Sequence, residues 1–315
     1  MKKTNTWLSK RIFQFVLLAL VCGYFQPLTQ TPALKHLSIA LFAYMTFATS
    51  LGISFSKFLR IARNPKIPLY ILGIVHIVTP IVAWIIGMLF FPDQQLIRLG
   101  YLISAVIPVG ITSVIWTDIV KGNVPVSLVT VTIDTLLAPL LLPAAILFIV
   151  GVAISIDYKA MIIDLLFMVT LPSITGMLLY DLTDGRTMSF AEGAGGILSR
   201  ISIFGIVYLN AAFVSTWIDW SPLMLKILFV TGLIVSIGYF VGYAAGKAIR
   251  SDHATTLSVI HNTGMRNIVV GLVIATNYFK PETAIPVALA MIFQQPFAAL
   301  TARIYSWKFP GYENE

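Results

Sequence analysis

The chain has 315 residues, of which 58% are hydrophobic and only 11% are charged, and its mean hydropathy is +0.89. Soluble globular domains carry about a quarter of charged residues, so this composition excludes a soluble protein and indicates a polytopic membrane protein. The formal net charge of +8 would suggest nucleic-acid binding in a soluble chain, but here the basic residues lie between apolar segments, where they set membrane topology.

Ten apolar segments are long enough to be membrane spans, for which about 20 residues are needed. In chain order they cover residues 12–25, 34–55, 67–91, 99–120, 124–150, 161–180, 201–218, 223–248, 255–279 and 284–305. The first follows four basic residues and resembles a signal peptide, but no small-residue cleavage motif precedes the later spans, so we interpret it as a retained helix. The longest connection, 181–200, contains Gly193, Gly195 and Gly196 and is predicted to be a flexible loop. We expect residues 1–315 to form one polytopic membrane domain.

The lysines and arginines of the connections predict the orientation of the spans. With the amino terminus in the cytoplasm, fifteen lie on the cytoplasmic side, five on the outer side and one, Arg266, within the membrane. Cytoplasmic loops carry the excess of basic residues, so this bias favours ten spans with both termini cytoplasmic. We therefore expect a multi-pass protein of the cell (plasma) membrane, surrounded by the lipid bilayer and without a nucleic-acid partner. The oligomeric state stays open.

Ten spans divide into two halves of five, and an odd half places its second copy upside down in the membrane. The first copy covers residues of about 10–150 and the second about 160–307. Pro108-Val109-Gly110 lies at the centre of the fourth span and Thr263-Gly264 at the centre of the ninth, which is the fourth of its half. Paired interruptions of this kind indicate a transporter with its substrate site at the interface of inverted repeats. The alternative is that they are ordinary, because glycine and proline are common in membrane helices.

Two charged residues lie deep within these spans. Asp134 and Arg266 each follow the cytoplasmic start of their span by eleven residues, which places both about 16 Å deep at 1.5 Å per residue. An Asp134–Arg266 pair would lower the desolvation cost of both groups, and it could act either as a gate or as a structural lock. His76 in the third span is a further candidate for charge coupling, since histidine can shuttle protons, although a lone histidine is more often a packing residue.

The other polar side chains of the interrupted spans and of the last span are candidates for the lining of the substrate site. Amides and hydroxyls can bind a polar solute, although an isolated Ser or Thr in a membrane helix often only bonds its own backbone. The predicted substrate-binding residues are Thr112, Ser113, Asn262, Thr263, Asn267, Gln294 and Gln295.

Several other kinds of site are excluded by the sequence. The single cysteine, Cys22, can form neither an intramolecular disulfide nor a cysteine metal cluster. The chain contains no H-E-x-x-H motif, no G-x-S-x-G motif and no Walker glycine-rich loop. We therefore expect no enzyme activity, no catalytic residues, no bound metal and no cofactor, with sodium or a proton as the possible coupling ion.

Four stretches of the chain resemble the bile acid:sodium symporter family, whose superfamily also contains the arsenical resistance transporters. They are Pro108 through Ser113, Lys121-Gly122-Asn123, Thr132 through Pro139, and Gly264-Met265-Arg266-Asn267, and the ten-span pattern extends the resemblance over the whole chain. The resemblance implies an all-α integral membrane protein with a panel domain and a core domain, in which spans four and nine are broken and cross. It also implies that organic anions bind near this crossing, at the amino termini of the half-helices, and that rocking of the two domains alternates access.

The chain differs from sodium-coupled members at positions that the resemblance assigns to sodium. Those members have Glu where this chain has Asn262, Gln where it has Arg266, and Ser-Asn where it has Ser113-Val114. The remaining candidates for an ion site are Ser113, Ser127, Thr132 and Asn262, which include no carboxylate. We expect the Arg266 guanidinium to stand in for sodium, neutralised by Asp134 or by the substrate. This argues against sodium coupling and leaves proton coupling or uniport open.

The sequence thus predicts a secondary active transporter that moves a small organic anion by alternating access, as importer or exporter. An arsenite-type exporter is an alternative, since residues Pro108 to Trp116 and Asp134 are similar to that family. The fourth span, however, has no cysteine to bind soft As(III). A membrane-embedded enzyme and a sensor that binds without transporting are the competing classes.

Overall fold

A computed structural model describes residues 2–61, 63, 65–150, 156–215 and 221–309, and the secondary structure of this part of the chain is helical. Six continuous helical stretches in it are long and apolar enough to cross a membrane, namely Lys66–Phe90, Val124–Val150, Tyr158–Leu182, Ala194–Val214, Pro222–Ala248 and Pro281–Lys308. Three shorter helices are also apolar, namely Gln14–Tyr24, Gln95–Val106 and Ile268–Tyr278. The prediction of an all-α membrane protein is therefore confirmed.

The helices of the first half follow the apolar segments of the sequence. They are α1 (Lys2–Lys10), α2 (Ile12–Tyr24), α3 (Pro32–Ser50), α4 (Phe55–Ile61), α5 (Lys66–Gly73), η1 (Ile74–Val78), α6 (Thr79–Phe90), α7 (Gln95–Val106), α8 (Thr112–Ile119) and α9 (Val124–Val150). Thr31 begins α3 as its N-cap by accepting a hydrogen bond from the Leu34 N–H at 3.3 Å. Lys66 to Phe90 forms one continuous stretch, made of α5, η1 and α6.

The helices of the second half also follow the apolar segments of the sequence, except at residues 181–200. They are α10 (Tyr158–Leu165), η3 (Leu166–Thr170), α11 (Leu171–Leu182), α12 (Thr187–Glu192), α13 (Ala194–Val214), α14 (Pro222–Ala248), α15 (His253–Gly264), α16 (Ile268–Tyr278), η5 (Pro281–Thr283) and α17 (Ala284–Lys308). The prediction of a flexible loop at 181–200 is wrong, because α12 and the first turns of α13 occupy most of it. A Cβ on Gly196 would lie 2.4 Å from the Asn5 side chain, so small residues serve here for close packing of α1 on α13.

Two of the long helices contain a widened π turn just before a proline. The π turn η1 ends at Val78 and is followed by Thr79-Pro80, and η3 ends at Thr170 and is followed by Leu171-Pro172. Proline has no N–H to donate within the helix, so the turn before it loses its regular hydrogen bonding and can widen. In the first of these turns the widening places His76 toward the interior of the molecule.

The fourth and ninth predicted spans are each broken into two short helices. α7 and α8 are separated by residues 107–111, and α15 and α16 by residues 265–267. Ile107 is extended, with ψ at 151°, because the ring of Pro108 disfavours helical geometry in the residue before it. In the ninth span no proline is present, and the break follows Asn262-Thr263-Gly264, which are poor helix formers. The predicted interruptions at both places are confirmed.

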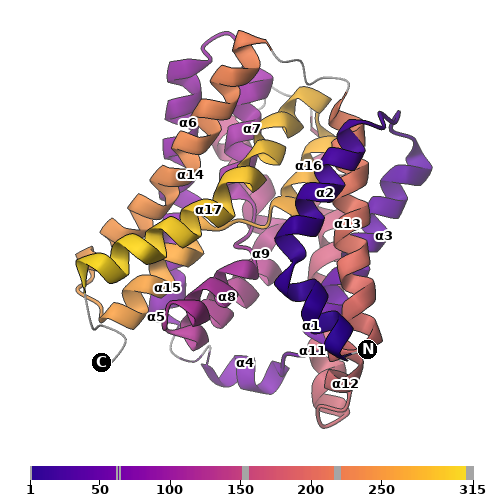
Figure 1. The fold of residues 1–315 in the computed structure, drawn as a ribbon, viewed down its shortest axis with the longest axis vertical. Helices are drawn as coiled ribbons and strands as arrows, with labels where there is room; N and C mark the ends of the chain where they lie inside the picture. Colours follow the sequence, from indigo (N-terminus) through magenta and orange to yellow (C-terminus); the bar gives the residue numbers. More distant parts are fainter. Residues whose placement is uncertain (1, 62, 64, 151–155, 216–220, 310–315) are drawn as a thin grey trace.

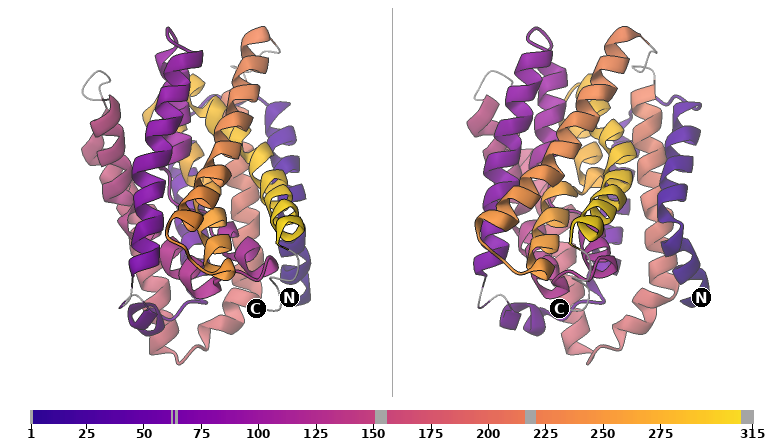
Figure 2. Two further views of the ribbon diagram at one scale, coloured as in Figure 1. Left: turned by 90° about the vertical axis from the view of Figure 1, so that its left-hand side faces the viewer. Right: turned by 60° about the vertical axis from the view of Figure 1, so that its left-hand side comes forward.

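The helices pack in two groups, which Figures 1 and 2 show from different sides. In the first, which we call the α13 group, α2 and α3 lie against α13, and α11 lies against α3. In the second, which we call the crossing group, α14 packs along α15 and α17, α6 packs on α7, and α8 and α9 both contact α15. The two groups meet along α16, which contacts both α17 and α13.

Candidate functional site

The two broken helices cross at their breaks, where Val109 and Arg266 pair as a short antiparallel bridge. Two backbone hydrogen bonds flank this pair, from the Gly110 N–H to the Met265 carbonyl (3.2 Å) and from the Asn267 N–H to the Pro108 carbonyl (2.7 Å). A Cβ on Gly110 would lie 2.9 Å from the Arg266 carbonyl oxygen, so glycine is needed for this approach. The pairing satisfies peptide groups that the helix breaks would otherwise leave without partners inside the membrane.

Gln294 of α17 holds the same segment from another side. In the amide orientation that satisfies both of its polar atoms, Nε2 donates to the Arg266 carbonyl (3.2 Å) and Oε1 accepts from the Arg266 N–H (3.0 Å). The Gln294 side chain thus bonds the extended backbone of Arg266 as a neighbouring β-strand would. Together with the bridge to Val109, it fixes the direction in which the Arg266 side chain leaves the backbone.

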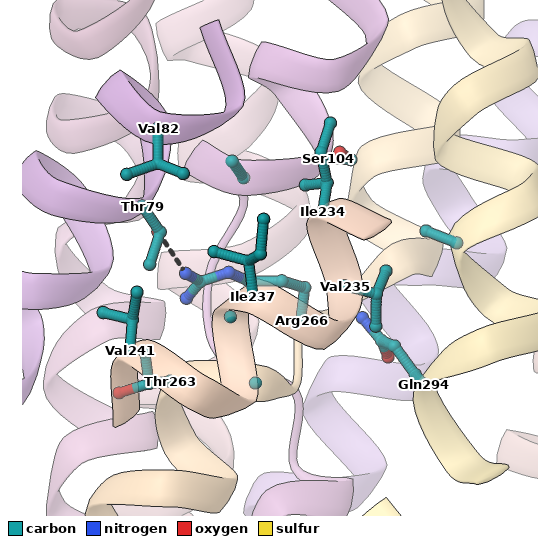
Figure 3. A pocket seen from close by; sticks show the side chains of 14 residues that line it. Thr79, Val82, Ser104, Ile234, Val235, Ile237, Val241, Thr263, Arg266 and Gln294 are labelled. Carbon is teal, nitrogen blue, oxygen red and sulfur yellow. Dashed lines mark hydrogen bonds between the residues drawn. The ribbon is translucent and has the colours of Figure 1, made fainter. Parts of the chain in front are cut away.

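The Arg266 side chain lies inside the crossing group, between α6 and α14 (Figure 3). It is only 7% exposed, and its Nη2 donates to the Thr79 hydroxyl at 2.6 Å. The Thr79 hydroxyl in turn donates to the Val75 carbonyl at 2.9 Å, so the π turn before α6 helps to orient it. The other terminal nitrogen, Nη1, is buried without a hydrogen-bond partner.

Asp134 of α9 is fully buried, and both of its carboxylate oxygens are occupied. Oδ1 lies 2.6 Å from His76 Nε2, and Oδ2 accepts from the Val109 N–H at 2.7 Å. The direct Asp134–Arg266 pair that equal depth suggested is therefore not formed, and His76 is the hydrogen-bond partner of Asp134 instead. The reason is geometric, because depth alone does not say which face of a helix a side chain leaves. Asp134 attracts Arg266 electrostatically without contacting it, and Val109 also links the two residues, since its N–H binds Asp134 and its backbone pairs with that of Arg266.

Asn262 of α15 lies in a closed cluster of hydroxyl groups. Its Oδ1 accepts from Ser113 (3.1 Å), and its Nδ2 donates to the Ser127 hydroxyl (2.6 Å) and to the Ser258 carbonyl (2.8 Å). Thr117 bonds Ser127 at 2.8 Å and completes the cluster. The predicted ion-site residues Ser113, Ser127 and Asn262 thus meet, but their oxygens already have protein partners. Thr132 is elsewhere and donates to the Leu128 carbonyl of its own helix at 2.8 Å.

The crossing separates two cavities. The Arg266 cavity, of about 40 Å³, is lined by residues of α6, α7, α14, α15 and α17 as well as by Arg266. The Asn267 cavity, of about 80 Å³, is lined by residues of α3, η3, α9, α11 and α16 and by the first break, including Pro108, Val109 and Asn267. Successive side chains of an extended segment point to opposite sides. This explains why Arg266 and Asn267, which are neighbours in sequence, line different cavities.

The structure places the seven predicted substrate-binding residues at several positions around the crossing rather than along one cavity. Thr263 and Gln294 line the Arg266 cavity, and Asn267 lines the Asn267 cavity. Ser113 and Asn262 belong to the closed hydroxyl cluster, and Gln295 accepts a hydrogen bond from Trp116 Nε1 at 2.7 Å. Thr112 is the first residue of α8.

Several polar residues at the cavities were not singled out in the sequence. They are Thr79 and Ser104 at the Arg266 cavity and Thr46, Thr49, Ser50, Thr135 and Ser173 at the Asn267 cavity. Thr79 lies three residues after His76, and this helical spacing is a signal that could have pointed to it. The hydroxyls of α3 carried no such signal, because isolated Ser and Thr are ordinary in membrane helices. Within the described part of the chain, no group of three His, Cys, Asp or Glu residues is placed to hold a metal ion.

Comparison with known proteins gives a consistent set of relatives. Residues 38–220 match the profile of the Sodium Bile acid symporter family. The chain is 32% identical to the uncharacterized protein YbaS of Bacillus subtilis (strain 168), over 82% of this chain and 85% of that protein. It is 26% identical to the uncharacterized sodium-dependent transporter YocS of the same organism, over 93% and 90%. It is 25% identical to the probable sodium/metabolite cotransporter BASS1, chloroplastic, of Oryza sativa subsp. japonica, over 65% and 50%.

These findings confirm the resemblance seen in the sequence. They also indicate that the protein is a membrane transporter. Since the family profile matches more than half of the chain and one relative is 32% identical over most of its length, the chain belongs to the Sodium Bile acid symporter family.

Proposed function

We propose that the chain carries a small organic anion across the cell membrane by alternating access, with the cargo bound in the Asn267 cavity. This cavity lies where the α13 group faces the crossing group. The α13 group contributes the hydroxyls of Thr46, Thr49, Ser50 and Ser173, and the crossing group contributes Thr132, Thr135 and Asn267. A cavity between two bodies can open to either side of the membrane when one body moves past the other.

Two half-helices that begin at the edge of this cavity support an anionic cargo. α8 starts directly after Ile111 and α16 directly after Asn267, and both of these residues line the cavity. The amino terminus of a helix carries a partial positive charge and N–H groups without helical partners, so it attracts anions. The Asn267 side-chain oxygen caps the Val270 N–H at 3.5 Å, which leaves its amino group as a donor for a carboxylate or sulfonate.

The observation that carries the proposal on coupling is the hydrogen bonding at Asn262 and Arg266. A hard cation needs several oxygen ligands that are free to face it. Here the amide donors of Asn262 point at the Ser127 hydroxyl and the Ser258 carbonyl, and the same broken span carries the fixed positive charge of Arg266, which donates to Thr79. We therefore propose that Arg266 takes the place of a coupling sodium ion and that transport does not require sodium, in contrast to relatives whose names state sodium dependence.

The test has two stages. Thermal unfolding of the purified protein with a panel of carboxylates and sulfonates, in sodium and in choline salts, identifies a ligand. Uptake of that labelled ligand into proteoliposomes is then compared with sodium or choline outside. Equal uptake in the two salts supports the proposal, and loss of uptake in choline contradicts sodium independence. Binding without flux indicates a sensor and chemical conversion of the ligand indicates an enzyme, and either result contradicts a carrier.

Proton coupling is a second candidate, favoured by the hydrogen bond between His76 and Asp134. The pair is buried, its two groups are 2.6 Å apart, and the carboxylate also holds the backbone of the crossing at Val109. A change in protonation there would act on the Val109 segment, which also lines the Asn267 cavity. An inward proton gradient in choline buffer should accelerate uptake into wild-type proteoliposomes, and His76→Gln should remove the acceleration. Equal uptake with and without the gradient would instead support uniport.

We further propose ten spans in two inverted repeats, with the α13 group as panel domain and the crossing group as core domain. Support comes from the matching breaks in spans four and nine and from α1 and the end of α17, which lie toward the same end of the bundle (Figure 2). The excess of basic residues predicts that this end is cytoplasmic, in the plasma membrane. Single cysteines placed at residues 28 and 121 in a Cys22→Ser background should be labelled from opposite sides of intact cells. Labelling of both from one side would refute this topology.

An arsenite-type exporter receives no support from the structure. The single cysteine, Cys22, lies in α2, which packs against α13 rather than at the crossing. A soft As(III) centre requires thiolate ligands, and the residues that line the two cavities include none.

A further inference from the structure

The Arg266 cavity contains a buried cation with an unused hydrogen-bond donor. Figure 3 shows the guanidinium reaching Thr79, with side chains of α14 alongside. Its Nη1 has no partner, and neither has the hydroxyl of Thr263, which lines the same cavity and is only 1% exposed. A buried polar group without a partner is costly, and a charged one more so. Two such groups on one small cavity therefore indicate a ligand that accepts hydrogen bonds.

The other polar side chains of this cavity are already satisfied. The Ser104 hydroxyl donates to the Tyr101 carbonyl at 2.8 Å, and Gln294 binds both backbone groups of Arg266. The Thr79 hydroxyl donates to the Val75 carbonyl and accepts from Arg266. The cavity therefore offers Arg266 Nη1 and the Thr263 hydroxyl as donors.

The charge of the cavity is also unbalanced at close range. Its fourteen lining residues include no Asp and no Glu, and most of them are apolar. The carboxylate of Asp134 attracts the guanidinium electrostatically but does not contact it, because its oxygens are bound to His76 and to the Val109 N–H. A water molecule would satisfy the two donors but would leave the guanidinium without an anion beside it. An anion satisfies the donors and also offsets the cost of burying the positive charge.

The size of the cavity limits what that anion is. About 40 Å³ exceeds the roughly 10–15 Å³ that a cavity needs to hold one water molecule, but it is only half the volume of the Asn267 cavity, so the site has room for a small anion. The apolar walls, such as Val82, Ile234 and Val241, favour a singly charged ion that loses its hydration readily. We propose that the Arg266 cavity is a binding site for a single chloride ion, held by Arg266 Nη1 and the Thr263 hydroxyl.

This site is distinct from the cavity proposed for the organic anion, because the crossing lies between them. The chloride proposal does not depend on transport, and its test is a binding experiment on the purified protein. A chain that binds chloride and transports nothing would support this inference and contradict the proposed function, so the two failures can be told apart.

The first experiment measures thermal unfolding in detergent, with sodium gluconate replaced stepwise by sodium chloride or bromide at constant ionic strength. Wild-type protein should show a rise in unfolding temperature that grows with the logarithm of the halide concentration and reaches about 4 °C at roughly a hundred times the dissociation constant. Fitting this rise gives the concentration that half-saturates the site. Arg266→Gln should show no halide-dependent rise. Thr263→Val should raise the half-saturating concentration by about tenfold, the effect expected for one lost hydrogen bond to a charged group.

Ser104→Ala is the matched control, because it lies on the same cavity but its hydroxyl is used by a backbone carbonyl. Its half-saturating halide concentration should equal that of the wild type. A wild-type protein without a halide response, or a response that Arg266→Gln retains, would overturn the proposal.

The second experiment avoids substitutions altogether. Crystals of the wild-type protein grown in bromide should show an anomalous scattering peak within hydrogen-bond distance of Arg266 Nη1. Well-ordered crystals without a peak at this position would contradict the site, whether or not bromide binds at the protein surface.

Discussion

At the scale of single residues, the buried charges of this protein are held by separate neighbours rather than by each other. Arg266 donates to Thr79, and Asp134 binds His76 and the Val109 N–H. Asp134 and Arg266 are therefore both connected to the crossing at the short segment where the backbones of Val109 and Arg266 pair. Removing either group leaves its partners buried with unmet hydrogen bonds, which costs more than the loss of a surface contact.

Arg266→Ala should lower transport to below about a tenth of the wild-type rate, because the loss of one charged hydrogen bond corresponds to a change of roughly 10- to 100-fold. The measurement is uptake per molecule of protein extracted from the membrane, so that insertion is counted separately. Arg98→Ala is the control, since Arg98 donates to the Pro92 carbonyl at 2.6 Å in a turn outside the crossing. Wild-type uptake by Arg266→Ala would reduce this residue to a structural role.

The double substitution Asn262→Glu with Arg266→Gln should make ligand binding depend on sodium. It places a carboxylate beside the hydroxyls of Ser113 and Ser127 and removes the competing positive charge. The family resemblance assigns these same two residue types to sodium-coupled members. The half-saturating ligand concentration should fall at least about threefold when choline is replaced by sodium. A folded double variant that ignores sodium would show that Asn262 and Arg266 do not decide the coupling.

At the scale of elements, the broken helices are the feature on which the site depends. Each break exposes peptide groups at the ends of two half-helices. At the crossing these groups are hydrogen-bonded, because one break pairs with the other. The π turn η1 also presents a polar group to the site, because it places His76 beside Asp134 without ending the helix. Regular helices would satisfy their own backbone groups and leave none of them free to bind a ligand.

Gly110→Ala should destabilise the protein by about 1–3 kcal/mol and slow transport, because the added methyl group would lie 2.9 Å from the Arg266 carbonyl oxygen and overpack the crossing. Thermal unfolding in detergent and uptake measure the two effects. Gly73→Ala is the matched control, since a Cβ there meets no atom within 4 Å and alanine favours the helix by up to about 1 kcal/mol. Equal stability of the two variants would mean that the crossing tolerates a wider separation.

At the scale of the whole molecule, the two groups of helices are tied together at one end, beyond the Asn267 cavity. Tyr278 at the end of α16 donates to the carboxylate of Asp164 and to the Ala160 carbonyl (3.2 Å) in α10. Thr276 of α16 donates to Asn210 of α13 at 2.7 Å. By the predicted topology this is the outer end. These hydrogen bonds must break if the cavity is to open outward.

Tyr278→Phe should therefore shift the protein toward the state that is open at this end. The measurement is labelling of a Thr46→Cys substitution in the Asn267 cavity, in a Cys22→Ser background, by a membrane-impermeant thiol reagent added outside intact cells. The labelling rate should rise by roughly tenfold, as expected for the loss of one hydrogen bond to a charged group. Tyr208→Phe, which removes a hydrogen bond to Gln26, serves as control. An unchanged rate would show that these bonds do not hold the outer end closed.

The sequence by itself determined the features that depend on neighbouring residues. The length of the apolar segments predicted the helices, and Pro108 and the run before Met265 predicted the two breaks. It failed at 181–200, where glycines that suggested flexibility serve close helix packing instead.

Only the tertiary structure decided which groups meet. His76 and Asp134 are 58 residues apart, and Thr79 and Arg266 are 187 apart, so their pairing depends on how the helices are arranged and rotated. The separation of Arg266 and Asn267 into two cavities likewise follows from the extended crossing, in which adjacent side chains point to opposite sides. Hydrophobic periodicity and depth carry no information on rotation about a helix axis when a helix is apolar on every face, and this is the physical reason that the partners could not be predicted.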